Sequence, residues 1–322
     1  DQGRADAQRN LGSMYHNGQG VKKDLKKAAQ LINLAADQGN AVSQSNLGGM
    51  YQNGQGVKKD LKKAAQLFRL AADQGNADAQ SSLGYMYHHG QGVEKDYAES
   101  ARLLRLATDQ GDAAAQTLLG YMYHNGEEVV EDYAEAARLY TLAADQGHAA
   151  AQLNIGVMYR NGQGVSQDLK KAARLLRLAA DQGNVDARTN LGGMYIVGQG
   201  VKKDLKKAAQ LIRLAADQGD ATAQASLGGM YYNGQGVKKD LKKAARLYRL
   251  AADQGDADAQ SHLGYMYHHG QGMKKDYAES ARLIRLAADQ GHAAAQSCLG
   301  YMYHNGEGVV KDLGEAARLY TL

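Results

Sequence analysis

The sequence comprises 322 residues, with 38 basic and 34 acidic side chains and a net charge of +4. This excess is too small to predict nucleic-acid binding, and apolar runs of only a few residues exclude a transmembrane helix and a signal-peptide core. The single cysteine, Cys298, excludes an intrachain disulfide and a cysteine-based zinc framework. We therefore expect a soluble protein that does not insert into membranes, and the lack of a disulfide requirement favours a cytoplasmic location.

A 36-residue period organises the chain from its first residues to its last. A glycine recurs at this spacing from Gly12 to Gly300 without an insertion, and proline is absent. Such a period predicts stacked repeats, each formed of two helices joined by glycine turns. The expected fold class is all-α, a single solenoid over residues 1–322 made of nine helix-turn-helix repeats. The repeats are 1–36, 37–72, 73–108, 109–144, 145–180, 181–216, 217–252, 253–288 and 289–322, the last being two residues short.

Local signals predict where the helices of each repeat begin and end. In the second repeat, the apolar spacing predicts a first helix over 41–53, with Asn40 as its N-cap and Gly54 as a left-handed residue at its end. An aspartate precedes the second helix of each repeat. In the third repeat this residue is Asp96, and Glu99 follows it at the spacing of a capping box.

The repeated glycine lies inside the first helix, where it costs about 1 kcal/mol relative to alanine. A residue that recurs in every repeat despite this cost needs a packing reason. We expect the second helix to approach Gly48 closely, with Ala64 and Ala65 providing a matching small surface.

The pattern LGxMYxxGxGVxxD, followed by AAxLxxLAADQG, resembles the Sel1-like repeat, a relative of the tetratricopeptide repeat. The resemblance covers the whole chain. It implies antiparallel helix pairs in a right-handed superhelix and a role as an adaptor that holds other proteins together. The chain lacks the paired cysteines of the secreted, cysteine-rich branch of that family, so nothing is carried over from that branch.

A longer repeat is superimposed on the 36-residue one. The segment DYAESARLLRLATDQG beginning at Asp96 corresponds to DYAESARLIRLAADQG beginning at Asp276, 180 residues later. A duplication of five repeats accounts for this match and predicts two similar surface patches. Neither end has the polar terminal element that a finished solenoid needs, so we expect the chain to be a fragment of a longer array.

Positions that differ between repeats mark side chains that the fold leaves free. In the first helix these positions lie on one face, opposite the repeated Leu47, Met50 and Tyr51, which are predicted to be core. The resemblance implies that the variable face lines the concave surface, where tyrosine and histidine suit the binding of a peptide or protein. The alternative is that these are ordinary solvated residues. The predicted partner-binding residues are Tyr85, His88, His89, Tyr121, His124, Asn125, His262, Tyr265, His268, His269, Tyr301, His304 and Asn305.

Other site chemistries are disfavoured by the same pattern. Adjacent His88 and His89 point about 100° apart on a helix and lack a regular third ligand, so no metal is expected. Gly90 and Gly92 have no strand before them and no Lys-Ser/Thr after them, which disfavours a dinucleotide or phosphate loop. Cys298 lacks an activating constellation. We expect neither catalysis nor a cofactor.

Two function hypotheses remain. The first is a non-catalytic protein–protein interaction scaffold or adaptor that binds a peptide or protein in its concave groove. The second is a structural, self-assembling repeat protein that forms homo-oligomers or filaments through its end faces or edges. A KKDLKK motif in four repeats is interpreted as a solubilising outer face rather than a phosphate track, so a nucleic-acid partner is disfavoured.

Overall fold

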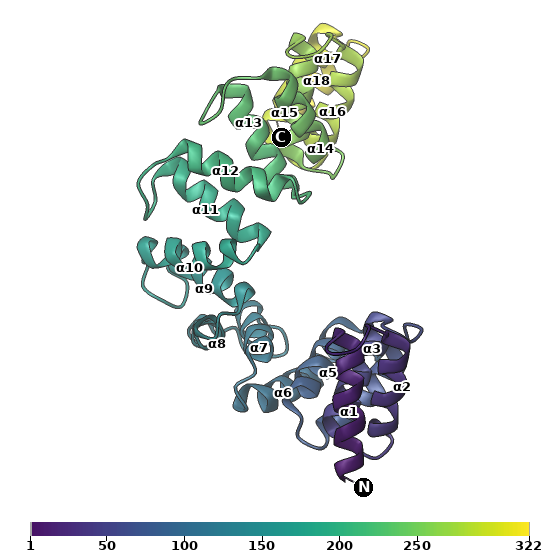
Figure 1. Ribbon diagram of the computed structural model, residues 1–322. Coiled ribbons are helices and arrows are strands. Elements are labelled where there is room, and N and C mark those ends of the chain that lie inside the picture. Colours follow the sequence, from purple (N-terminus) through teal and green to yellow (C-terminus); the bar gives the residue numbers. More distant parts are fainter. Residues whose placement is uncertain (1, 322) are drawn as a thin grey trace. The chain divides into compact units, whose positions relative to one another are not determined.

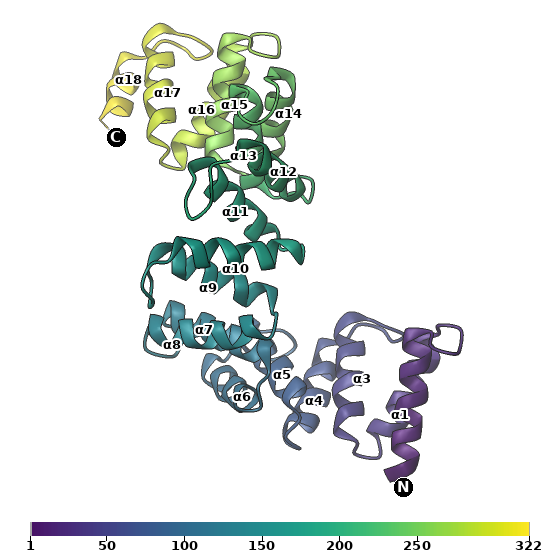
Figure 2. The same ribbon diagram turned by 60° about the vertical axis from the view of Figure 1, so that its left-hand side comes forward.

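The computed structural model describes residues 2–321, with side chains from residue 4 onward. The chain divides into two compact parts, Asp1–Gln167 and Asp168–Leu322, which we call the N-terminal part and the C-terminal part. Each part consists of helices joined by short turns (Figures 1 and 2). No strand occurs among residues 2–321, which confirms the predicted all-α fold.

Helices alternate as predicted between a first and a second helix of each repeat. Within each part, a first helix packs against the second helix that follows it in the chain. The N-terminal part contains α1 (Gln2–Asn17), α2 (Leu25–Ala36), α3 (Ala41–Asn53), α4 (Leu61–Ala72), α5 (Ala77–His89), α6 (Tyr97–Asp109), α7 (Ala113–Asn125), α8 (Tyr133–Asp145) and α9 (Ala149–Asn161). The C-terminal part contains α10 (Leu169–Asp181), α11 (Val185–Val197), α12 (Leu205–Ala216), α13 (Ala221–Asn233), α14 (Leu241–Ala252), α15 (Ala257–His269), α16 (Tyr277–Asp289), α17 (Ala293–Asn305) and α18 (Leu313–Tyr320).

The predicted helix ends are confirmed, with one exception. The Asn40 side chain accepts a hydrogen bond from the third residue of α3, and Gly54 ends that helix at φ 70°. Asp96 caps α6 by accepting from the Glu99 backbone N–H at 2.9 Å. The reciprocal half of the capping box is wrong, because the Glu99 carboxylate accepts two hydrogen bonds from Arg102 instead, both at 2.7 Å.

In the first helices other than α9, the repeated glycine does have a close neighbour on the second helix, and a large side chain makes the closest approach. A Cβ built on Gly48 would lie 2.9 Å from the Phe68 ring, and a Cβ on Gly12 would lie 3.3 Å from the carbonyl oxygen of Ala28, the residue equivalent to Ala64. The corresponding glycines approach Leu104 and Tyr140 in the next two repeats. A large side chain of the second helix therefore fills the space that the missing Cβ leaves.

Buried glutamines join successive repeats and hold the first helices in register. Gln80 on α5 is buried and donates to the Ala72 carbonyl at the end of α4 at 3.3 Å. Its own side-chain oxygen accepts from Gln110, which follows α6, at 2.8 Å. The same pair of bonds recurs at Gln260 and Gln290 in the C-terminal part. These bonds satisfy the buried amide and fix the position from which each first helix presents its outer side chains.

Candidate functional site

Four predicted tyrosines are exposed on first helices. Tyr85 on α5 and Tyr121 on α7 are 42% and 43% exposed, and Tyr265 on α15 and Tyr301 on α17 lie at the matching places in the C-terminal part. The methionine that follows each of them is buried. The helical period therefore separates a core side from an outer side in these four helices, as the repeat comparison predicts.

The histidine four residues after the tyrosine fixes its ring. His89 stacks on Tyr85 with ring centroids 4.0 Å apart, and its Nδ1 donates to the Tyr85 carbonyl at 2.9 Å. The pair His269 and Tyr265 repeats this geometry at 4.0 Å and 3.0 Å. Each pair presents two rings whose rotamers are already restricted, which lowers the entropy lost when a partner binds.

His88 has a different environment from His89. It is only 7% exposed, and its Nε2 donates to Glu127 Oε2 in the turn after α7 at 2.7 Å. The rings of Tyr97 and Tyr121 meet its ring edge-on. His268 forms the same bond with Glu307 at 2.7 Å in the C-terminal part. These two histidines join neighbouring repeats and are less accessible than the tyrosines.

The remaining predicted residues divide between exposed and packed positions. The exposed ones are Asn125, His262, His304 and Asn305, of which Asn305 donates to the Tyr301 carbonyl at 3.1 Å. His124 meets the Tyr133 ring edge-on at 5.1 Å. His262 stacks on Tyr248 at 5.1 Å, and burial raises the pKa of that tyrosine to about 12. The role of these residues in partner binding stays a prediction.

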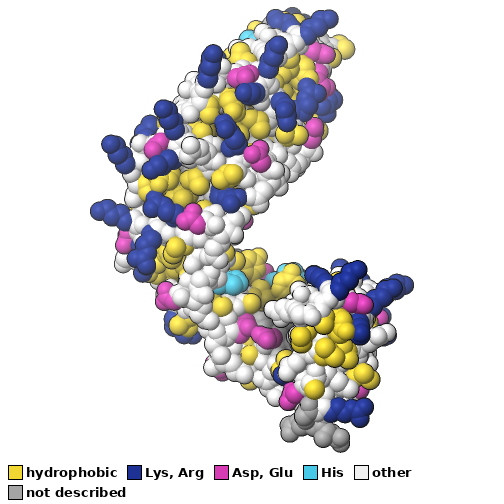
Figure 3. Space-filling model, in the orientation of Figure 1, with side chains coloured by type: hydrophobic (Ala, Val, Ile, Leu, Met, Phe, Trp, Pro, Cys, Tyr) yellow, Lys and Arg dark blue, Asp and Glu magenta, His cyan; other side chains and the backbone are white. Residues whose placement is uncertain are grey.

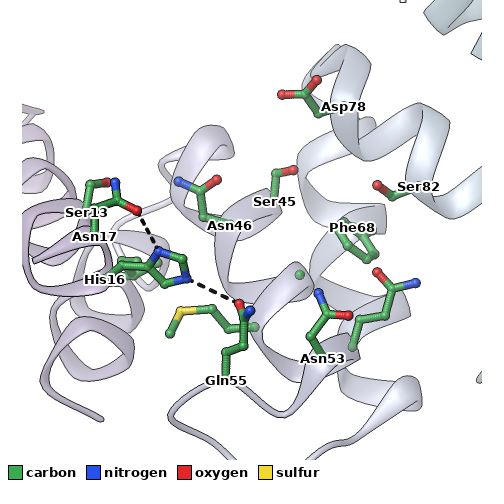
Figure 4. Close-up of a pocket in the computed structure, with 14 residues that line it drawn as sticks. Ser13, His16, Asn17, Ser45, Asn46, Asn53, Gln55, Phe68, Asp78 and Ser82 are labelled. Atoms are coloured by element: carbon green, nitrogen blue, oxygen red, sulfur yellow. Dashed lines mark hydrogen bonds between the residues drawn. The ribbon is translucent and has the colours of Figure 1, made fainter. Parts of the chain in front are cut away.

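A hollow on the first-helix face of the N-terminal part was missed by the sequence interpretation. It measures about 390 Å³ and lies between α1, α3 and α5, with Met50 and Phe68 among its lining residues (Figure 4). Gly49 leaves it open, because a Cβ there would have nothing within 4 Å. Its polar lining is rich in amides and hydroxyls, from Ser13, Asn17, Ser45, Asn46, Gln52, Asn53, Gln55 and Ser82. Several of these residues occupy positions that vary between repeats. This variation is the sequence signal that could have revealed the hollow.

The duplicated place in the C-terminal part is filled differently. Tyr248 takes the position of Phe68, and its hydroxyl would lie 3.3 Å from a Cβ at Gly229, the counterpart of Gly49. His262 takes the position of Ser82 and stacks on the Tyr248 ring. Two side chains thus occupy space that is open beside α3. The duplication predicts two similar surface patches. The replacement of Phe68 and Ser82 by Tyr248 and His262 makes the two patches different.

Reactive groups are not gathered on this face. Among the described residues, no group of three or more His, Cys, Asp or Glu side chains could hold a metal ion. Burial raises the pKa of the Cys298 thiol and so favours its protonated, less nucleophilic form. The chemistry that the face offers is hydrogen bonding by amides and hydroxyls together with aromatic contact.

Comparison with known proteins identifies the repeat. The family model described as Sel1 repeat matches nine consecutive segments, at residues 5–40, 41–76, 77–112, 113–148, 149–184, 185–220, 221–256, 257–292 and 293–322. The chain belongs to the Sel1 repeat family. Proteins with Sel1 repeats generally mediate protein–protein interactions, and no described helix of this family member is both long and apolar enough to cross a bilayer.

Two solved structures with Sel1 repeats are similar to this family member. One is a protective antigen of uropathogenic Escherichia coli strains that displays an SLR fold, with 36% identity over 99% of this chain and 76% of that one, and a TM-score of 0.53. The other is a Sel1 repeat protein from Oxalobacter formigenes, with 31% identity over 75% of this chain and 95% of that one, and a TM-score of 0.69. A search of curated proteins found no match.

Proposed function

We propose that this Sel1 repeat protein is a non-catalytic scaffold that binds a peptide or protein partner on the face formed by its first helices. The observation that carries the proposal is the exposure of Tyr85 and Tyr121 on neighbouring helices, each at a position that the repeat does not require for its core. Large aromatic side chains dominate the binding energy of many protein interfaces. The stacked His89 ring adds area next to Tyr85 without a further loss of rotamer freedom.

The hollow beside α3 supports a polypeptide partner in particular. Amide side chains such as Asn46 and Asn53 can donate to and accept from a peptide backbone, which carries both groups at every residue. Met50 and Phe68 form the apolar floor of the same hollow, although both are almost fully buried. A partner segment would thus gain backbone hydrogen bonds near α3 and aromatic contact near α5 and α7.

Replacing Tyr85 and Tyr121 together by alanine is expected to weaken partner binding by tenfold or more, because truncation of central aromatic contacts costs about 2 kcal/mol or more. Both side chains are exposed, so the melting temperature should stay nearly unchanged. Partners captured from a lysate of the source organism on the immobilised chain would be identified by mass spectrometry, and their affinity would be measured by calorimetry.

The matched control is the pair Leu70→Ala and Leu106→Ala. These leucines are similarly exposed, but they lie on the second helices α4 and α6. The control pair should leave affinity unchanged. Equal losses in both double variants, or unchanged affinity after the tyrosine replacements, would refute the first-helix face as the binding surface.

Filling the hollow provides a second test. The double variant Phe68→Tyr and Ser82→His places beside α3 the residue pair that occupies the corresponding space at Tyr248 and His262. The fold already accommodates this pair, so stability should be retained while partner affinity falls. Retained affinity would show that the partner does not enter the hollow, and the tyrosine variants would still report on the rest of the face.

A further inference from the structure

The largest excess of positive charge lies in one stretch, and a smaller excess lies in residues 1–72, which contain 11 basic and 5 acidic side chains. Residues 169–250 contain 16 basic and 6 acidic side chains, whereas residues 1–168 contain 16 and 19, and residues 251–322 contain 6 and 9. The small net charge of the chain thus conceals a segment of +10 between two segments of −3. This segment covers the second helices α10, α12 and α14 and the first helices between them.

Second helices of two kinds occur, and they differ in whether an internal glutamate neutralises an arginine. In α8, Arg138 donates two hydrogen bonds to Glu135, at 2.8 and 2.7 Å, and α16 repeats this pair with Arg282 and Glu279. In α10 and α14, the residue three positions before the arginine is Lys171 or Lys243. Lysine cannot accept a hydrogen bond, so it adds positive charge instead of neutralising it.

The basic face also has a recess and an apolar component. A cavity of about 430 Å³ is lined by Arg213, Tyr231, Val237, Lys238, Lys239 and Lys243, together with Asp240, which caps α14. Leu178, Leu214 and Leu250 are exposed in the last turns of the three helices, each next to an arginine in the sequence. Figure 3 shows Lys and Arg side chains around hydrophobic patches on one face of this part.

Mixed basic and apolar surface selects among anionic partners. A phosphate backbone would satisfy the lysines and arginines but would leave the exposed leucines without apolar contact. An acidic polypeptide segment with interspersed apolar residues complements both components. Three extended residues span about 10 Å, which matches the spacing of packed helices, so one triplet of two acidic residues and one apolar residue corresponds to each second helix.

We propose that the outer face of α10, α12 and α14 binds an acidic segment of a protein partner, with carboxylates against its lysines and arginines and an apolar side chain against each exposed leucine. The cavity at Arg213 receives one carboxylate, beside Lys238 and Lys243. This surface is separate from the tyrosines and the hollow of the first-helix face, so it does not depend on the function proposed above. It makes the scaffold able to hold two partner segments at once.

The test uses the full chain and a fluorescein-labelled peptide of three Glu-Glu-Leu triplets, with binding measured by fluorescence anisotropy. The double variant Lys171→Glu and Lys243→Glu introduces the glutamate that precedes Arg138 in α8 and Arg282 in α16, so the helices should form normally. We expect it to weaken binding about tenfold or more, because it adds a repulsive charge and an internal partner for each arginine. Circular dichroism checks that helix content is retained.

The matched control carries the same change of charge at the same helical position in the N-terminal part, as Lys27→Glu and Lys63→Glu in α2 and α4. It should change affinity less than about twofold. Equal weakening in both double variants, or no binding by the unmodified chain, would overturn the proposal. Tighter binding of an oligonucleotide of equal charge would assign the face to nucleic acid, and a Glu-Glu-Ser probe binding as tightly as Glu-Glu-Leu would remove the role of the leucines.

Discussion

Alanine at Gly192 is expected to destabilise the protein, whereas alanine at the adjacent Gly193 is expected to stabilise it. A Cβ at Gly192 would lie 2.5 Å from Ile212 Cγ1, so the isoleucine would have to move in a filled core. Overpacking of this kind costs about 1–3 kcal/mol, partly offset by the better helix propensity of alanine. We expect the free energy of unfolding to fall by about 1–2 kcal/mol.

Substitution of the adjacent Gly193 measures the effect of helix propensity without a change in core packing. A Cβ at Gly193 would have nothing within 4 Å, so alanine there should raise the free energy of unfolding by about 1 kcal/mol. Urea titrations followed by circular dichroism measure both values, since the chain has no tryptophan. The substitution Ile212→Ala removes the overlapping Cγ1, so it should destabilise the Gly192→Ala variant less than it destabilises the unmodified protein. Equal stabilisation by both alanines would show that packing against Ile212 is not the reason for the repeated glycine.

This pair of glycines illustrates what the sequence could and could not predict. Repetition showed that Gly48 and its equivalents need a close neighbour, because an unexplained helix glycine would not recur in every repeat. The identity of the neighbour depends on the register in which two helices cross. Ala64, Ala65 and Phe68 lie on the same face of α4 and are all buried, so periodicity alone could not choose among them.

On the outer face of the first helices, exposure could be predicted where it depends on one helix but not where it depends on a neighbouring repeat. Exposure of Tyr85 followed from comparison of the repeats, because it depends only on position along one helix. The surroundings of His88 include Glu127, 39 residues later in the next repeat, which accepts its hydrogen bond. A signal existed in the sequence, since Glu127 and Glu307 replace glutamine in the repeats that follow a pair of histidines. Comparison within single repeats could not reveal it.

Replacing Glu128 by glycine is expected to stabilise the protein by about 1 kcal/mol. Glu128 has φ 54° and is the one residue other than glycine with a positive φ among the described residues. The equivalent Gly308 has φ 72°, and a Cβ there would lie 1.9 Å from the Tyr277 carbonyl oxygen. Because Glu128 carries a Cβ, its turn cannot approach Tyr97 as closely as Gly308 approaches Tyr277. Glycine removes the left-handed strain and permits the closer approach.

The inverse substitution, Gly308→Glu, gives the turn the Gly-Glu-Glu-Val-Val sequence that surrounds Glu128. It should lower the free energy of unfolding by about 2 kcal/mol or more, because it combines left-handed strain with an overlap against backbone, which cannot yield as a flexible side chain does. Denaturant titration of both variants checks that their changes in the free energy of unfolding have opposite signs. Stabilisation or no change at Gly308 would mean that the turn can move away from Tyr277 at little cost, and Glu128 would then be tolerated for the same reason.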